Sequence, residues 1–129
     1  DIALVSVGEA ISQTVRDSDL VARYGGDEFA IVTPETDAAE ISILANRLVQ
    51  AVRDTGLRDW DGNAIPLSIS VGGAVLAAST RQPAEIEALL AAADRSLYEA
   101  KSAGKDRTGR IVDLGTSRED YAPSADAAG

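Results

Sequence analysis

The stretch RYGGDEFAIV, residues 23–32, sets two glycines and two carboxylates between residues that favour β-strand. Residues 20–24 and 29–32 are short runs rich in apolar and β-branched side chains, so they predict two strands joined by a hairpin with GGDE at its tip. A solvated turn would explain this tip, because Gly and Asp are common in turns. A ligand site would explain it as well, since glycine lets a ligand approach the backbone and adjacent carboxylates suit Mg²⁺.

The composition limits the chemistry that the chain can perform. Its 129 residues, 45% of them hydrophobic, are enough for one domain with a core. Cysteine and histidine are both absent from the sequence, which excludes disulfides, thiolate or imidazole metal ligands and histidine general bases. The net charge of −9 disfavours binding to nucleic acid. No apolar run approaches the ~20 residues of a membrane span, so we expect a cytoplasmic protein without direct membrane contact.

Hydrophobic periodicity predicts the remaining elements. Apolar residues three and four apart predict helices from Leu4 to about Arg16, from Ile41 to Val52, and from Pro83 to about Gly104. In the third helix the expected buried stripe comprises Ile86, Leu89, Leu90, Ala93, Leu97 and Ala100. Alternating apolar residues predict a strand over 65–71, and a last strand is expected at 110–114. The fold class is therefore α+β, an antiparallel sheet with packed helices, followed by a disordered tail at 115–129.

Four segments together resemble one protein family. The core GGDEF stands unaltered at residues 25–29, and RYGGDEFAIV resembles the signature of the GGDEF domain family, the diguanylate cyclases. RDSDLVARYGG (16–26) resembles the approach to that signature, LSISVGGA (67–74) a central strand, and ADRSLYEAKSAGKDR (93–107) the closing helix. The resemblance identifies residues 1–114 as a partial GGDEF domain.

This resemblance implies a palm-like fold, similar to that of nucleotide cyclases and polymerases. It also implies a homodimer in which each subunit holds one GTP, and the two GTP molecules condense into cyclic di-GMP and two pyrophosphates. The expected cofactor is Mg²⁺ or Mn²⁺, because divalent ions neutralise charge on the reacting phosphoryl oxygens. In the parent protein we expect fusion to a sensor domain or a phosphodiesterase domain.

The resemblance assigns roles to the hairpin tip and to the end of the third helix. Asp27 and Glu28 correspond to the metal-binding, catalytic carboxylates, and Gly25 and Gly26 let the nucleotide approach the backbone. Lys101 and Lys105 correspond to the basic pair that grips the β- and γ-phosphates, and one helical turn would place both on one face. An ordinary basic helix end, favoured by the helix dipole, is the alternative for the lysines. The nucleotide account requires the hairpin tip and the lysines to converge.

Three further positions are carried over from the family. Arg16 and Asp19 form the RxxD pattern of the product-inhibition site, where the two groups would bind phosphate and guanine. A helix-end salt bridge is the alternative. Arg47 corresponds to a secondary product contact, with a solvated helix charge as its alternative. Asp1 corresponds to an aspartate that contacts the guanine edge of the substrate.

One departure from the family pattern lies at the front of the sequence. The first strand and helix of the family fold do not precede Asp1. We therefore expect a fragment of a complete cyclase, inactive when it is alone. A catalytically degenerate domain that binds cyclic di-GMP or GTP as a regulatory module is the alternative.

Overall fold

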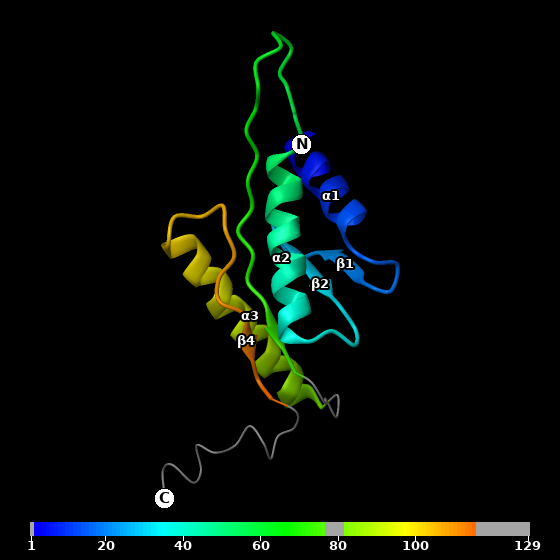
Figure 1. Cartoon of the computed structure of the whole chain (residues 1–129), viewed down its shortest axis with the longest axis vertical. Helices are drawn as coiled ribbons and strands as arrows, with labels where there is room; N and C mark the ends of the chain where they lie inside the picture. Colours follow the sequence, from blue (N-terminus) through cyan, green and yellow to red (C-terminus); the bar gives the residue numbers. More distant parts are fainter. Residues whose placement is uncertain (1, 77–81, 116–129) are drawn as a thin grey trace, which may run out of the picture.

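The computed structural model describes residues 2–76 and 82–115, which form three helices and four short strands (Figure 1). Their order is α1 (Ile2–Thr14), β1 (Leu20–Arg23), β2 (Phe29–Val32), α2 (Ala38–Arg53), β3 (Ala74–Val75), α3 (Pro83–Ser102) and β4 (Val112–Asp113). This order confirms the predicted α+β class. Asp1 and the expected disordered tail from residue 116 onward lie outside the described residues. In the described part, no helix combines the length and apolarity that crossing a membrane requires.

The strands form two separate pairs. β1 and β2 pair antiparallel, with Leu20 opposite Val32 and Arg23 opposite Phe29, which confirms the predicted hairpin. β3 and β4 pair in parallel, and α3 is the crossover between them, as a parallel pair requires. The expected antiparallel arrangement therefore holds for the hairpin and not for the second pair.

α1 and α2 lie side by side and form the core (Figure 1). Val7 and Ile11 of α1 and Leu48 and Val52 of α2 are buried against one another, on the faces that the periodicity predicts. α2 begins with a capping box at Asp37. The Asp37 carboxylate accepts from the Glu40 amide at 2.8 Å, and the Glu40 carboxylate accepts from the Asp37 amide at 3.1 Å.

The predicted strand over 65–71 was wrong as a hydrogen-bonded element. The Ile65 amide donates to the Leu57 carbonyl at 2.8 Å, but residues 66–70 run extended without pairing with another described segment, and Pro66 has no amide hydrogen to donate. The alternation was correct, because Leu67, Ile69 and Val71 pack against the core. Bridges stand only at the ends of this region, between Arg58 and Ala64 and between Val71 and Thr108.

The predicted buried stripe of α3 was right only in part. Ala100 is buried and Leu89, Ala93 and Leu97 are half-buried, whereas Ile86 and Leu90 are about half exposed. The most buried face of the helix carries the small side chains of Ala92, Ser96 and Ala100. Such a face lets the helix axis come close to a neighbouring backbone, a gain that hydrophobic periodicity does not register.

Two glycines make this close approach possible. A Cβ on Gly72 would overlap the backbone of Leu97, and a Cβ on Gly109 would overlap the carbonyl of Ser96. The Ser96 hydroxyl, 1% exposed, accepts a hydrogen bond from the Gly73 amide at 3.1 Å. α3 is thus seated directly on the backbone of 71–73 and 107–109.

Residues 55–65 form an arm that extends beyond the ends of α1 and α2, at the top of Figure 1, before the chain runs back alongside α2. Its tip is ordered by the Asp59 carboxylate, which accepts from the amides of Asp61 and Asn63 at 2.9 Å each. These hydrogen bonds hold the pKa of Asp59 below its usual value, and the bond from the Asn63 amide contributes most. Trp60, between these residues, is fully exposed.

We expect Gly72→Ala to destabilise the protein by about 2 kcal/mol, because the added methyl group must push α3 away from the backbone of 71–73. The matched control is Gly8→Ala in α1, where the new Cβ would lie 3.7 Å from the Phe29 ring. Gly8→Ala should stabilise the helix by up to about 1 kcal/mol. Urea denaturation followed by circular dichroism measures both changes. Equal effects of the two substitutions would contradict the close seating of α3.

Candidate functional site

The hairpin tip is held in a fixed conformation by its own backbone. Gly25 has a φ of +85°, which a side chain would strain, so a glycine is required there. The Tyr24 amide donates to the Glu28 carbonyl at 2.7 Å and closes the turn. From β1, the Arg23 guanidinium donates through Nε to the Gly26 carbonyl at 3.1 Å. At Gly26 an added Cβ would meet nothing within 4 Å, so packing does not require this second glycine.

Asp27 and Glu28 are both exposed at this tip. The Glu28 side chain folds back over Gly25, with Oε2 3.2 Å from the position that a Cβ would take there. Neither carboxylate is engaged in a hydrogen bond or ion pair within the described part of the chain. Across residues 2–76 and 82–115, no three acidic side chains are grouped to hold a metal ion. Two adjacent free carboxylates fit a Mg²⁺ ion that completes its shell with water and ligand phosphate.

The two lysines do not share a helical face, contrary to the prediction. Lys101 lies in the last turn of α3, but the helix ends at Ser102 and Lys105 lies beyond it with a φ of +65°. The helix closes with a Schellman motif around Gly104. The Gly104 amide donates to the Lys101 carbonyl at 3.3 Å, and the Lys105 amide donates to the Ala100 carbonyl at 2.9 Å. Both lysine side chains are exposed.

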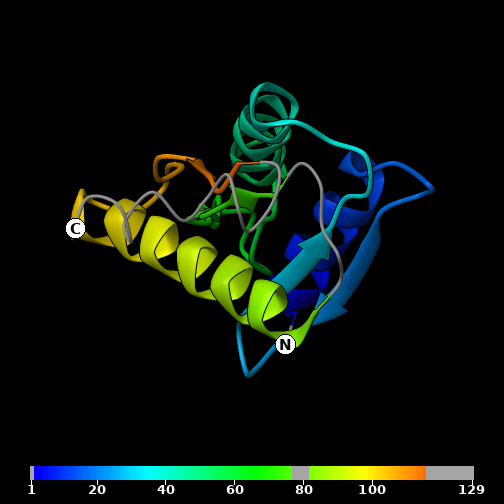
Figure 2. The ribbon, with the colours of Figure 1, turned by 90° about the horizontal axis from the view of Figure 1, so that it is seen from below.

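The described structure does not bring the hairpin tip and the lysines into contact. Figure 2 shows the loop between β1 and β2 and the C-terminal end of α3 as two separate projections. No described hydrogen bond or ion pair connects these two regions. The roles of Asp27, Glu28, Lys101 and Lys105 therefore stay predictions.

Arg16 and Asp19 form a closed pair at the end of α1. The Asp19 carboxylate accepts from the Arg16 amide at 2.9 Å and from the Arg16 guanidinium at 3.4 Å. Arg16 also donates to the Pro34 carbonyl at 3.3 Å and to the Thr36 hydroxyl at 2.7 Å. The Asp19 side chain is 1% exposed and that of Arg16 is 53% exposed. The pair thus ties the loop after α1 to the segment before α2, and it leaves part of the guanidinium open to solvent.

The other two assigned residues have less structural context. Arg47 is exposed on α2 and makes no hydrogen bond or ion pair with another described residue. Asp1 lies outside the described residues, so its assignment as a guanine contact is untested.

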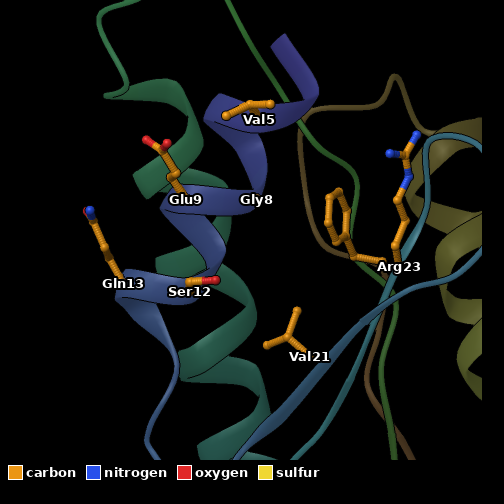
Figure 3. Close-up of a pocket in the computed structure, with 8 residues that line it drawn as sticks. Val5, Gly8, Glu9, Ser12, Gln13, Val21 and Arg23 are labelled. Carbon is orange, nitrogen blue, oxygen red and sulfur yellow. The ribbon is translucent and has the colours of Figure 1, made fainter. Parts of the chain in front are cut away.

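A groove that the sequence did not indicate lies between α1 and the hairpin, with a volume of about 460 Å³ (Figure 3). Val5 and Gly8 of α1 face Val21, Arg23 and Phe29 of the hairpin across it. The one feature of the sequence that could have indicated this groove is Gly8. A glycine inside a helical pattern often has a packing reason, and here the Phe29 ring lies close to it. Arg23 lines this groove and also holds the hairpin tip at Gly26.

We expect Asp19→Ala to lower the free energy of unfolding by about 1–2 kcal/mol, because it leaves the Arg16 amide without its acceptor. Arg16→Ala removes a half-exposed ion pair and should cost no more than about 1 kcal/mol. Asp17→Ala, an exposed neighbour, is the control. Urea denaturation measures the three variants, and an Arg16→Ala loss larger than that of Asp19→Ala would contradict this account of the pair.

Comparisons with known proteins identify the family. The family model described as "Diguanylate cyclase, GGDEF domain" matches residues 1–107. Diguanylate cyclase DosC of Escherichia coli strain K12 is 40% identical over 107 residues, which cover 83% of this chain and 22% of DosC. The uncharacterized protein YhcK of Bacillus subtilis is 34% identical over 107 residues, 83% of this chain and 29% of YhcK. The chain spans less than a third of the length of these relatives.

Solved structures show the same fold. The diguanylate cyclase SiaD of Pseudomonas aeruginosa, crystallised with its activator SiaC, superposes with a TM-score of 0.71 and 26% identity, over 87% of this chain and 40% of that one. The hairpin with its unaltered GGDEF core, the order of the elements and these likenesses agree with one another, and they confirm the predicted palm-like α+β fold. The chain therefore belongs to the GGDEF domain family of diguanylate cyclases.

Proposed function

We propose that this chain supplies the catalytic site of a diguanylate cyclase, which condenses two GTP molecules into cyclic di-GMP and two pyrophosphates within its full-length protein. The main support is the hairpin tip. A left-handed Gly25 and an open Gly26 present Asp27 and Glu28 to solvent, and no described partner neutralises these carboxylates. Because GTP is an intracellular nucleotide, this function would place the protein in the cytoplasm.

The proposed reaction is the attack of the ribose 3′-oxygen of one GTP on the α-phosphorus of the other. The new P–O bond replaces the bond to the leaving pyrophosphate, the hydroxyl proton is released to water, and the second ester bond forms in the same way. Mg²⁺ or Mn²⁺ bound at the tip would supply charge neutralisation and activation of the hydroxyl. Asp27 and Glu28 would hold that ion, and the open backbone at Gly26 would leave room for the nucleotide.

The lysines and a second copy of the chain would complete the site. Lys101 and Lys105 are exposed cations at the end of α3, and they would bind the β- and γ-phosphates as point charges. Each copy would present one GTP, so a homodimer would bring the two reacting groups face to face. Figure 2 shows the hairpin loop and the end of α3 apart from each other, so a bound GTP would have to reach both regions.

We propose that Arg16, Asp19 and Arg47 form a site for the product, in which Asp19 holds Arg16 in place. The Arg16 side chain is 53% exposed, and Thr36 and Asp19 fix the position of its guanidinium. A fixed and partly exposed guanidinium suits a phosphate of cyclic di-GMP. Asp19 is less suited to direct contact, because its side chain is 1% exposed and already accepts two hydrogen bonds from Arg16.

A regulatory module that binds cyclic di-GMP or GTP without turnover is the second candidate. It is favoured by one observation: the Arg16–Asp19 pair is already formed, whereas the hairpin tip and the lysines make no described contact. Turnover of GTP by the full-length protein decides between the two functions.

We expect Asp27→Ala to reduce the formation of cyclic di-GMP roughly 100-fold or more, because it removes a metal-binding carboxylate. Asp61→Ala, an exposed carboxylate on the arm tip, is the matched control and should keep normal turnover. Chromatography of the nucleotide products, with release of pyrophosphate as a second readout, measures both variants. Normal turnover in Asp27→Ala would rule out this role of the hairpin tip.

We expect Arg16→Ala to weaken the binding of cyclic di-GMP by about tenfold or more, the size of one charge-assisted contact to phosphate. Isothermal titration calorimetry with cyclic di-GMP measures the affinity. The exposed Arg95 of α3 provides a control substitution, Arg95→Ala, that should leave the affinity unchanged. An unchanged affinity in Arg16→Ala would refute product binding at this pair.

A further inference from the structure

The loop that follows α3 has an uncommon backbone. Gly104, Lys105 and Asp106 have consecutive positive φ values of 125°, 65° and 51°. Glycine adopts such a value without cost, but residues with a side chain rarely do. Two of them in succession persist only where the surroundings hold them. Lys105 therefore stands in a segment whose shape depends on other parts of the molecule.

Two of the interactions that hold this loop are local. The Lys105 amide donates to the Ala100 carbonyl at 2.9 Å, as part of the closing motif of α3. The Arg107 Nε donates to the Lys105 carbonyl at 2.9 Å. These bonds fix the peptide groups on both sides of Lys105, but they do not engage Asp106.

Asp106 is held from a distant element. Arg53, the last residue of α2, donates through Nε to the Asp106 carboxylate at 2.9 Å and through Nη2 to the Asp106 carbonyl at 2.9 Å. The two residues are separated by 53 positions in the sequence. A guanidinium can make both bonds because its donors are fixed in one plane, whereas the single ammonium of a lysine has no such fork.

The contact between Arg53 and Asp106, here called the tether, starts from a rigid part of the fold. Val52, the neighbour of Arg53, is completely buried, and Leu48 and Val49 precede it in the same buried face. The end of α2 is thus fixed by the core, and the Arg53 side chain carries that position to the loop.

The tether also affects charge. Asp106 is the nearest carboxylate in the sequence to Lys105, and Arg53 occupies it with an ion pair at 2.9 Å. The Lys105 side chain is exposed and takes part in no hydrogen bond or ion pair with the described residues. The same contact that shapes the loop thus supplies Asp106 with another cation and leaves the Lys105 ammonium available for an anion.

We propose that Arg53 is a positioning residue for Lys105: by binding both the carboxylate and the carbonyl of Asp106, it holds the left-handed loop in which Lys105 meets the nucleotide phosphates. This assignment rests on the proposed function for the role of Lys105. The contact between Arg53 and the loop is a property of the fold and is testable apart from that function.

The first experiment compares Arg53→Gln, Arg53→Lys and the control Arg95→Gln in the full-length protein. Arg95 lies on α3, exposed and without a partner among the described residues. Hydrogen–deuterium exchange of residues 103–109 should rise in both Arg53 variants and stay unchanged in Arg95→Gln. Steady-state turnover of GTP with Mg²⁺ should show kcat/KM lower by about tenfold in the Arg53 variants, the size expected for a misplaced binding group. Most of this loss should appear in KM.

A second set of variants separates positioning from a general loss of structure. Asp106→Asn keeps an acceptor for Arg53 and tolerates a positive φ, so it should retain normal exchange and turnover. Asp106→Val loses the acceptor and disfavours that φ, so it should behave like Arg53→Gln. In a Lys105→Ala background, Arg53→Gln should cause little further loss of kcat/KM, because it acts through Lys105.

Three results would overturn the proposal: exchange in Arg53→Gln equal to that in Arg95→Gln, unchanged kcat/KM in Arg53→Gln, or full additivity of Arg53→Gln and Lys105→Ala. Absence of GTP turnover in the unsubstituted protein would overturn the proposed function and with it the phosphate role of Lys105. The exchange measurement would still decide whether Arg53 orders the loop, so the two failures are distinguishable.

Discussion

The other parts of the domain are positioned by packing against one buried face of α2. Ala45, Leu48, Val49 and Val52 are buried along this face, and each Leu or Val buried in this way contributes about 1.5–3 kcal/mol. α1 packs against the helix through Val7 and Ile11, which in turn sets the direction of the hairpin that follows α1. A shift of α2 would therefore move both the hairpin and the C-terminal loop.

The two ends of α2 hold two of the candidate ligand-binding segments. At its N-terminal side, Thr36 precedes the Asp37 cap and accepts from Arg16. At its C-terminal end, Arg53 binds Asp106 in the loop after α3 that carries Lys105. These contacts are partly exposed and individually weak. They gain their effect from the rigid helix between them, which relates the proposed product pair and the proposed phosphate loop through one buried element.

The parts of the fold that depend on local sequence could be predicted, and those that depend on close approach could not. The hairpin follows from short β-favouring runs around Gly25 and Gly26, and α1 and α2 follow from apolar spacing. In α3 the periodicity identified Ala100 correctly but also indicated Ile86 and Leu90, whereas the close seating of the helix on glycine backbone buries the small residues Ala92 and Ser96. Along 65–70 the alternation was visible, whereas a strand also needs a partner, and a single segment of sequence does not reveal one.

In the candidate site, too, the features set by local sequence were predictable and those set by distant contacts were not. The signature specified a glycine at position 25 and free carboxylates beside it, and the φ of +85° at Gly25 agrees with that reading. The prediction that Lys105 is helical was wrong because Gly104 closes α3 before the second lysine. Glycine is the residue most often found just beyond the end of a helix. The burial of Asp19 was not predictable either, because it depends on the fold of the loop after α1.

The arm has a consequence for spectroscopy. Trp60 is the single tryptophan of the sequence, and in the folded protein its indole is surrounded by water at the tip of a projecting loop. Its emission wavelength in the native state should thus be close to that of the denatured chain, which makes intrinsic fluorescence a poor signal of global unfolding. For the same reason, a blue shift of that emission after adding another molecule would report contact at the arm alone.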